Sequence, residues 1–354
     1  MKHILYLIGS LSLGGAETIV VNTLNYLSDK YPEIKISLFT TLEGNGVLVN
    51  RLYKNIFYKH VDCSGTNFFN GAMTIKSYIK KNKVTHLHTH LFHSIMVGRL
   101  AITSKINLIE TYHNLEYHPE SVYYSKWRVV VDKFTFRKKT KSIYVSEDVR
   151  LSLVNSRPLN HNNIVLNNFA GVEFKYNYTF KKENTLKLIA IGNLKHDKNF
   201  KYALRSFFLL KNTSITLDIY GEGFLRPEME DFLLKNNPNV RLMGSVAITM
   251  EIFNEYDAFL MTSLNEGMPI SLLEAITFGL PCILPDHLPV MRQVAQNAGL
   301  YFSIKDEASL KNLLLTLIED KNIFTSMSQE TKKQSALFSV DNYVNLLADV
   351  YKIN

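Results

Sequence analysis

Short apolar runs alternate with longer amphipathic stretches along the whole chain. Runs typical of buried strands lie at residues 4–8, 36–39, 84–87, 108–110 and 142–145, and again at 186–191, 216–220, 240–243, 258–261 and 282–284. Amphipathic stretches such as 17–28 and 71–81 separate them and follow the 3.6-residue period of a helix. This alternation predicts parallel sheets with both faces covered by helices.

The pattern breaks once, in the polar and aperiodic segment 174–185. A chain of 354 residues is also too long for one ordinary core. We therefore expect two doubly wound, Rossmann-like α/β domains at 1–170 and 184–335, with a last helix within 336–354 that packs back toward the first. Open parallel sheets bind ligands at the carboxyl ends of their strands, so two such domains are expected to face an interdomain cleft.

Composition and charge narrow the class of protein. Apolar residues make up 46% of the chain and charged residues 20%, as in globular proteins. The net charge of +8 favours anionic partners, and two cysteines, Cys63 and Cys282, favour a reducing compartment such as the cytoplasm. The N-terminal apolar run is interrupted at Gly9 and Ser10, so we interpret it as a buried strand rather than a signal peptide. No run reaches the roughly 20 apolar residues that a membrane span needs.

Two loops in the first half carry candidate binding residues. "GSLSLGGAET" matches neither the dinucleotide fingerprint nor the P-loop, but Gly14 and Gly15 precede a helix start. The two glycines either form a tight turn between strand and helix or allow an anion to come close to the backbone amides. In "THLHTHLFHS" the histidines at 86, 88 and 90 alternate, which fits core positions, a metal site or a last histidine, His90, at the end of a strand. His113 ends the next strand in the same way, and no carboxylate or cysteine completes a metal set.

The segment 123–141 is basic and aromatic. It contains Trp127 and seven lysines or arginines, with Asp132 as its one acid. A solvated helix face, docking on an anionic membrane and binding of single-stranded nucleic acid are all compatible with this composition. No nucleic-acid motif accompanies the segment, so we expect no nucleic-acid partner.

Loops in the second half combine cations, glycines and carboxylates. Lys195 and Lys198 follow one strand, and Gly221, Gly223 and Arg226 follow the next, as a phosphate site would require.

The stretch "SLNEGMPISLLEAITFGLPC" places Glu266 in a loop and Glu274 about one turn inside a helix that starts near Pro269 and ends at Gly279. The amides of residues 267–270 lie between the two acids, at the positive end of the helix. Such a site suits a diphosphate together with sugar hydroxyls.

This stretch resembles the E-x7-E motif of the retaining glycosyltransferases of family four, which have the GT-B fold. The likeness covers nearly the whole chain in family order, through "LHTHL", "TYHN", "VLNN", "GNLKHDKN", "YGEGFLR" and "VRLMGSV". It resembles in particular the enzymes that build capsule, O-antigen and other surface glycans on polyprenyl-diphosphate carriers.

The resemblance implies a role for each candidate residue. His90, Glu266 and Lys198 would be catalytic: His90 near the reaction centre, Glu266 on the transferred sugar and Lys198 on the leaving diphosphate. Glu274 would bind the ribose, and His113 would face the acceptor or the cleft. With the glycines and cations already noted at strand ends, the expected donor-binding set comprises Gly14, Gly15, Asn193, Lys198, Gly221, Gly223, Arg226, Gly267, Met268, Pro269, Ile270 and Glu274. The family usually has arginine where this chain has Asn193, and Lys195 or Arg226 would have to compensate.

The implied activity is transfer of a sugar, with retention, from a nucleotide-sugar donor (UDP favoured) to a glycan or lipid-linked saccharide. No metal and no other cofactor is expected. The enzyme would be cytoplasmic and peripherally associated with the inner face of the membrane through residues 123–141. Two alternatives stay open, a non-catalytic scaffold subunit and a sugar-nucleotide epimerase.

Overall fold

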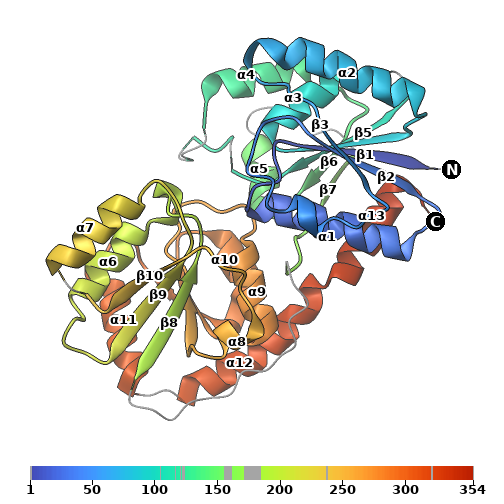
Figure 1. The fold of residues 1–354 in the computed structure, drawn as a ribbon. Helices are drawn as coiled ribbons and strands as arrows, with labels where there is room; N and C mark the ends of the chain where they lie inside the picture. Colours follow the sequence, from blue (N-terminus) through green and yellow to red (C-terminus); the bar gives the residue numbers. More distant parts are fainter. Residues whose placement is uncertain are drawn as a thin grey trace. The chain divides into compact units, whose positions relative to one another are not determined.

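The chain folds into two compact units. The computed structural model describes residues 2–103, 105–115, 117–119, 121, 124–154, 162–170, 185–236, 238–319 and 322–353. Unit 1 comprises Met1–Gly171 together with Val340–Asn354, and unit 2 comprises Val172–Ser339 (Figure 1). The segment expected to join them, 174–185, lies outside the described residues except for Thr185.

Unit 1 is built on a parallel sheet with the strand order β3-β2-β1-β4-β5-β6-β7. These strands are β1 (His3–Ile8), β2 (Lys35–Thr40), β3 (Phe57–His60), β4 (His86–His90), β5 (Asn107–Tyr112), β6 (Lys141–Tyr144) and β7 (Asn163–Val165). The strand order reverses between β1 and β4. The loops that follow these two strands therefore diverge and leave a possible binding position at the carboxyl ends of the strands.

Helices cover both faces of this sheet. α1 (Gly15–Lys30) and α13 (Val340–Tyr351) lie on one face, while α2 (Phe68–Lys81), α3 (Phe92–Ala101) and α4 (Lys126–Thr135) lie on the other (Figure 1). α5 (Glu147–Val154) follows β6. Alternate side chains of β1 point to opposite faces of the sheet. Leu5 and Leu7 belong to a buried cluster with α2 and α3, whereas Tyr6 contacts Tyr351 of α13.

Unit 2 repeats the same winding with six parallel strands in the order β10-β9-β8-β11-β12-β13. The strands are β8 (Leu186–Ile191), β9 (Ile215–Tyr220), β10 (Val240–Gly244), β11 (Ala258–Leu260), β12 (Cys282–Pro285) and β13 (Gly299–Phe302). Here the reversal falls between β8 and β11.

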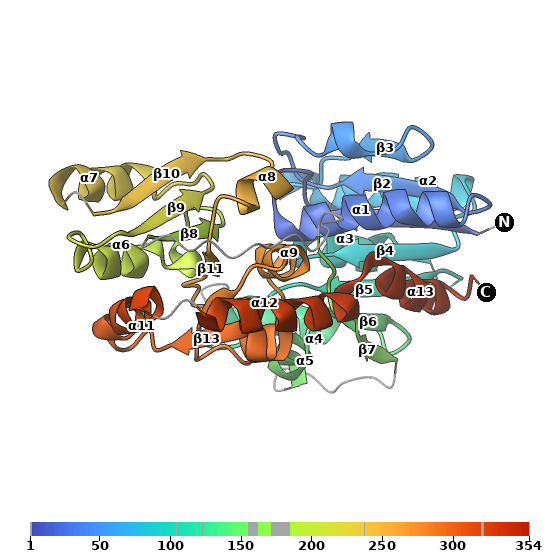
Figure 2. The same ribbon diagram turned by 90° about the horizontal axis from the view of Figure 1, so that it is seen from below.

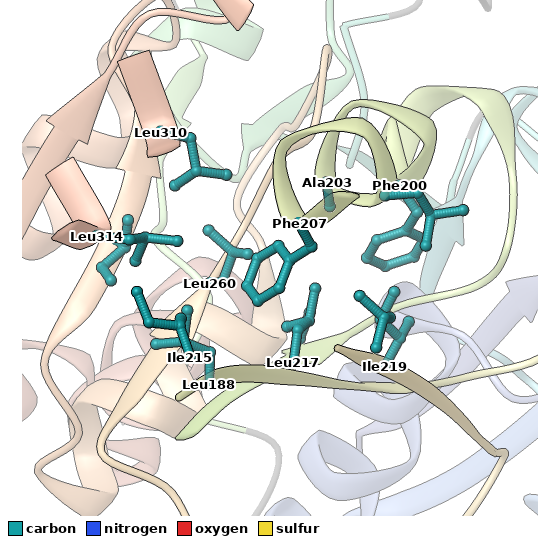
Figure 3. Close-up of a cluster of buried hydrophobic side chains, with 14 of the residues drawn as sticks. Leu188, Phe200, Ala203, Phe207, Ile215, Leu217, Ile219, Leu260, Leu310 and Leu314 are labelled. Atoms are coloured by element: carbon teal, nitrogen blue, oxygen red, sulfur yellow. The ribbon is translucent and has the colours of Figure 1, made fainter. Parts of the chain in front are cut away.

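Two groups of helices enclose the second sheet (Figure 2). One group contains α6 (Phe200–Phe208), α7 (Arg226–Asn236) and α11 (Glu307–Glu319), and the other contains α8 (Met250–Phe253), α9 (Ile270–Phe278), α10 (Pro289–Ala295) and α12 (Asn322–Ser335). Figure 3 shows the core under the first group, where Phe207 of α6 packs among Leu217 of β9 and Leu314 of α11. These side chains are fully buried, so this core fixes the sheet whose strand ends carry the candidate site.

The predicted α/β class with two Rossmann-like domains is confirmed, but several strand boundaries were wrong or missing. The strand expected at 84–87 is β4 (His86–His90), so the histidines form the strand rather than following it. Their polarity concealed a run that is buried on both faces. The strands β3, β7 and β13 were not predicted because they are short, and β3 is an edge strand with mostly exposed side chains.

Candidate functional site

An ion pair occupies the strand-order reversal of unit 2. Lys198 ends the single 3-10 turn His196–Lys198 after β8, and Glu266 lies in the loop after β11. The Lys198 Nζ donates to Glu266 Oε1 at 2.5 Å, and the Ser263 hydroxyl donates to the same oxygen at 2.7 Å. The side chains of Lys198 and Glu266 are only 20% and 11% exposed. Two residues predicted to act separately therefore form one unit.

Backbone contacts fix the two loops that carry this ion pair. The buried Thr262 hydroxyl donates to the carbonyl oxygen of Lys198 at 2.8 Å. The amide of Leu264 donates to the carbonyl oxygen of Asp197 at 2.7 Å. The cation is thus held in position before any ligand arrives, which is the support that a binding constellation needs.

The N-terminus of α9 lies directly after Glu266 in the chain. α9 starts at Ile270, and the preceding cap residue, Pro269, has no side-chain hydrogen bond to the first turn. The amide groups of this first turn can therefore donate hydrogen bonds to an anion at the positive end of the helix. Gly267, Met268 and Pro269 are buried and Ile270 is half-buried.

Glu274 lies one turn inside α9 and is half-buried. It is the one charged residue in the sequence of this helix, ISLLEAITF, and the rest of the helix is largely buried. Gly279, at a φ of 105°, ends the helix as predicted. A charged side chain is unusual in such an apolar helix, which is consistent with a ligand-binding role for Glu274.

Gly221 and Gly223 bring the loops after β8 and β9 into contact. Gly221 has a φ of +150°, and a Cβ there would lie 2.0 Å from the Gly192 carbonyl oxygen. A Cβ on Gly223 would lie 2.5 Å from the Leu194 carbonyl oxygen. Both glycines therefore have a demonstrable packing role, and their contact with a phosphate stays a prediction.

The cations near Asn193 differ in their availability. Arg226, at the start of α7, already pairs with Glu222 at 2.7 Å and with Glu230 at 2.8 Å. Lys195 is exposed, and Asn193 is half-buried. Of these cations, Lys198 is the one that the two loops hold in a partly buried position.

Unit 1 carries a histidine cluster at its own strand-order reversal. His88 lies between two hydroxyls, with Nδ1 2.5 Å from the Tyr351 hydroxyl and Nε2 2.7 Å from the Thr111 hydroxyl. His90 Nδ1 lies 2.9 Å from His113 Nε2. His90 Nε2 is buried and has no hydrogen-bond partner among the described residues. The next residue, Leu91, has a φ of 67°, which is strained for a bulky side chain and places the turn into α3 directly after His90.

The remaining unit 1 candidates, Gly14 and Gly15, start α1. Gly14 is the cap residue in extended conformation, with Glu17 in the first turn. A Cβ on Gly14 would lie 2.4 Å from a carboxylate oxygen of Glu17, but this is the flexible end of a side chain that can move aside, so local packing alone does not require glycine there.

Burial keeps the histidines of this cluster uncharged. It lowers the pKa of His86 and of His113 to about 4, and the pKa values of His88 and His90 lie well below their usual range for the same reason. Neutral rings can accept as well as donate hydrogen bonds. Within the described parts of the chain, no three histidine, cysteine or acidic side chains are arranged to hold a metal ion.

Sequence reasoning missed the residues that support these sites. Thr262 and Ser263 hold the ion pair, whereas Thr111 and Tyr351 hold His88. Tyr351 comes from the last helix, more than 260 positions along the chain from His88, so no local pattern could have indicated the contact. The position of Thr262 and Ser263 directly after a strand was a usable signal.

The two halves of the chain match two family models. Residues 13–167 match the model described as Glycosyltransferase Family 4, and residues 173–334 match the model described as Glycosyl transferases group 1. Together these two ranges span nearly the whole chain.

Individual relatives and structures agree with the family models. The chain is 25% identical to the capsular polysaccharide biosynthesis glycosyltransferase CapH of Staphylococcus aureus, over 78% of this chain and 79% of that protein. It is 24% identical to UDP-Gal:alpha-D-GlcNAc-diphosphoundecaprenol alpha-1,3-galactosyltransferase of Escherichia coli, over 79% of this chain and 78% of that protein. Two other relatives match over short stretches only, and the chain spans 14% and 19% of their lengths. The fold is that of Anabaena HepE in complex with UDP-glucose, with a TM-score of 0.84, 14% identity and full coverage of both chains.

No helix among the described residues is long and apolar enough to cross a membrane.

The buried histidines predict a loss of stability in mild acid. Below about pH 6.5 the unfolded chain takes up protons that the folded His86 and His113, with pKa values of about 4, do not accept. The free energy of unfolding should therefore fall by about 2 kcal/mol per histidine between pH 7 and pH 5. Urea unfolding at the two pH values measures this difference.

Two variants test whether His113 contributes to this pH dependence of stability. His113→Asn should lose about 2 kcal/mol of the pH dependence. Val97→Ala removes buried volume from the same unit without removing a titrating group, and it should keep the full pH dependence. Equal pH dependence in wild type and His113→Asn would contradict the assignment.

Proposed function

Because the chain belongs to the glycosyltransferases, with a family 4 N-terminal half and a group 1 C-terminal half, we propose that it transfers a sugar with retention from a UDP-sugar to a lipid-linked saccharide. We further propose that this reaction serves the biosynthesis of bacterial surface polysaccharide. The names of two relatives support this view, since one is a capsule enzyme and the other uses UDP-Gal and a diphosphoundecaprenol-linked acceptor. Family membership favours transfer over the scaffold and epimerase alternatives.

The observation that carries the proposal is the Lys198–Glu266 pair beside the start of α9. A partly buried ammonium group and the amides of a helix N-terminus both bind phosphate oxygens. Lysine has three donor hydrogens, so Lys198 can bind a phosphate while it keeps Glu266. A carboxylate that is already fixed at this place can accept hydrogen bonds from the hydroxyls of the sugar.

Different residues of unit 2 would then bind different parts of the sugar-nucleotide donor. Glu274 would accept two hydrogen bonds from the ribose, and the amides of residues 267–270 would hold the sugar together with Glu266. Lys198 would bind the diphosphate, and the loops at Asn193, Gly221 and Gly223 would line its approach. Arg226 is the weakest member of this set, because two carboxylates already bind it.

The reaction exchanges one bond of the sugar's anomeric carbon for another. The bond to the diphosphate oxygen breaks, a bond to the acceptor hydroxyl oxygen forms on the same face, and the hydroxyl proton passes to the departing phosphate oxygen. Lys198 and the α9 amides would stabilise the negative charge that develops on the diphosphate. The protein's remaining task is positioning, so the proposal assigns no metal or other cofactor.

In unit 1 the geometry selects one atom of the predicted catalytic histidine. His90 Nδ1 is engaged with His113, so Nε2 is the nitrogen left to contact a ligand. We assign His113 the role of orienting the His90 ring. Gly14 and Gly15 keep their proposed role at the diphosphate, through the amides at the start of α1.

A lipid-linked acceptor places the reaction at the inner face of the cell membrane. The basic residues of 124–141 support peripheral association there, since each cation close to an anionic lipid surface contributes about 1 kcal/mol. Tyr123, the first residue of the predicted segment, lies outside the described residues.

A panel of sugar nucleotides in a thermal-shift assay tests the donor. A ligand at 100 times its dissociation constant stabilises the protein by about 2.7 kcal/mol, so the correct donor should raise the melting temperature measurably. Stabilisation by a GDP-sugar but by no UDP-sugar would overturn the choice of nucleotide.

Lys198→Ala should lower turnover by about 100-fold or more, which is the effect of removing one stabiliser of a developing oxyanion. Lys211→Ala, at an exposed lysine after α6 that has no proposed contact with the donor, is the control and should change turnover little. Release of nucleoside diphosphate measures both. Full turnover in Lys198→Ala would place the diphosphate elsewhere.

Glu274→Ala should weaken binding of free UDP by about 1.5–3 kcal/mol, because a charged hydrogen-bonding group is lost. Glu274→Gln keeps the shape of the side chain and one carbonyl oxygen, so it should have a smaller effect. Glu319→Ala, at the exposed end of α11, serves as the control. Calorimetry that finds unchanged UDP affinity in Glu274→Ala would remove the ribose assignment.

Two substitutions at His90 separate its two ring nitrogens. Asparagine can retain the contact of Nδ1 with His113 but has no atom at Nε2, whereas glutamine can place a polar atom near Nε2. We therefore expect His90→Gln to retain more turnover than His90→Asn, with both melting temperatures recorded because the site is buried. The reverse order would show that the contact with His113, rather than Nε2, is what matters.

A further inference from the structure

Helix α4 (Lys126–Thr135) buries an acidic side chain and exposes apolar ones, which is the reverse of an ordinary surface helix. Its one buried residue is the acid Asp132. Three large apolar side chains are exposed instead: Trp127 at 59%, Val130 at 50% and Phe134 at 84%. We call these three residues the apolar stripe. At about 100° per residue the stripe lies on the side of the helix opposite to Asp132.

A buried ion-pair network holds the helix in this orientation. Arg99 of α3 binds the Asp132 carboxylate at 2.8 Å, the Asp132 carbonyl oxygen at 3.0 Å and the Thr135 hydroxyl at 2.8 Å. The same guanidinium binds both carboxylate oxygens of Glu110 at 2.7 Å. Arg99, Glu110 and Asp132 are at most 3% exposed. We call these three residues the clasp.

The clasp makes the exposed stripe a fixed property of the fold. Burial disfavours the charge on Arg99, but the two carboxylates more than offset this and raise its pKa above the ordinary value. Turning the stripe inward would leave those buried charges unpaired, which costs about 3–5 kcal/mol. A contiguous exposed apolar patch that is held outward marks an interaction surface.

The margins of the stripe are cationic. Lys126 and Lys133 lie on the helix beside it, and Arg137, Lys138 and Lys139 follow the helix, all exposed. Arg128 lies over the rings of Phe92 and Trp127, at 5.3 Å and 5.8 Å from their centroids. The segment 124–141 contains no acid besides the buried Asp132. This combination suits the boundary of a bilayer, where apolar side chains enter the acyl region and cations meet lipid phosphates.

Other occupants fit less well. A second copy of this face would bring two cationic margins together. A glycan could stack on an aromatic ring, but it also needs hydrogen-bonding groups beside that ring, and Val130 and Phe134 offer none.

We propose that α4 lies in the plane of an anionic bilayer with Trp127, Val130 and Phe134 inserted between the lipids, and that the clasp sets this orientation. This inference rests on the proposed function, because a lipid-linked acceptor requires the enzyme at that surface. It goes beyond charge attraction: the stripe makes part of the binding apolar, and that part does not depend on salt.

Trp127 provides the measurement, since it is the single tryptophan of the chain. The full chain is titrated with vesicles of phosphatidylglycerol and phosphatidylcholine, without donor or acceptor. Insertion should shift the Trp127 emission to shorter wavelength and protect it from acrylamide. Vesicles of phosphatidylcholine alone should produce neither change. After insertion, roughly 0.5 M salt should leave part of the signal, because salt screens charges but not apolar contacts.

The double variant Val130→Ser/Phe134→Ser should lower vesicle affinity by roughly tenfold or more and lose the salt-resistant part. Leu234→Ser, on α7 of unit 2, is the matched control because Leu234 is 87% exposed and Phe134 is 84% exposed. It should behave as wild type. Equal melting temperatures establish that all three proteins are folded.

Three results would overturn the inference: equal affinity of the double variant and wild type, vesicle pelleting without a change in Trp127 emission, or no pelleting of wild type. The second result would reduce the interaction to charge attraction, and the third would leave the stripe to a protein partner. UDP affinity should be unchanged in the double variant, since the stripe is not part of the donor site. A failure of UDP binding in wild type would therefore contradict the proposed function and not this inference.

Discussion

The reversal of strand order in each parallel sheet is the constraint on which the rest of the structure depends. Next to β1 and β8 the chain first winds outward in one direction and then crosses back to continue in the other. The loops on the two sides of the crossing leave in opposite directions, so the strand ends there are uncovered by backbone. Lys198 and Glu266 follow β8 and β11, the two strands of this crossing in unit 2, whereas His90 ends β4, at the crossing in unit 1. The chemistry is located where the winding leaves room for a ligand.

The sequence indicated the fold and many of the candidate residues because both depend on local patterns. Apolar runs, a helix start after Pro269 and the stop at Gly279 are all encoded within a few residues, and the structure has them at the expected places. What could not be predicted is which distant residues meet. The contact between Lys198 and Glu266 spans 68 positions, and the contact between His88 and Tyr351 spans 263. Both follow from strand order and helix packing, which a single sequence does not specify. The strand of histidines was misplaced for a related reason: its polar residues are buried by Tyr6, Tyr351 and neighbouring strands rather than by their own hydrophobicity.

Buried polar groups serve opposite purposes in the two units. In unit 2 the partly buried Lys198 and Glu266 compensate each other and leave donor hydrogens for a ligand. In unit 1 the histidines are held neutral by burial, and both ring nitrogens of His88 and Nδ1 of His90 contact a hydroxyl or another ring. Nε2 of His90, in contrast, is buried and has no hydrogen-bond partner among the described residues. An unsatisfied buried nitrogen costs free energy in the ligand-free protein, and a ligand hydroxyl at that position would recover it.

The orientation of α4 links the stability of unit 1 to the place where the protein acts. A helix that buries its acid and exposes its aromatic residues is unfavourable in water on both counts, because the ion must be desolvated and the apolar surface stays wet. The clasp offsets the first cost within the protein, through two carboxylates on one guanidinium. Trp127 contacts Phe92 and Arg128, but Trp127, Val130 and Phe134 all remain at least 50% exposed to solvent, so most of the second cost is not offset within the described residues. A bilayer would offset it without any rearrangement of the protein, and the clasp would then select the orientation in which the enzyme meets the lipid. The buried ion network therefore holds α4 in an orientation that is unfavourable in water but suited to contact with a membrane.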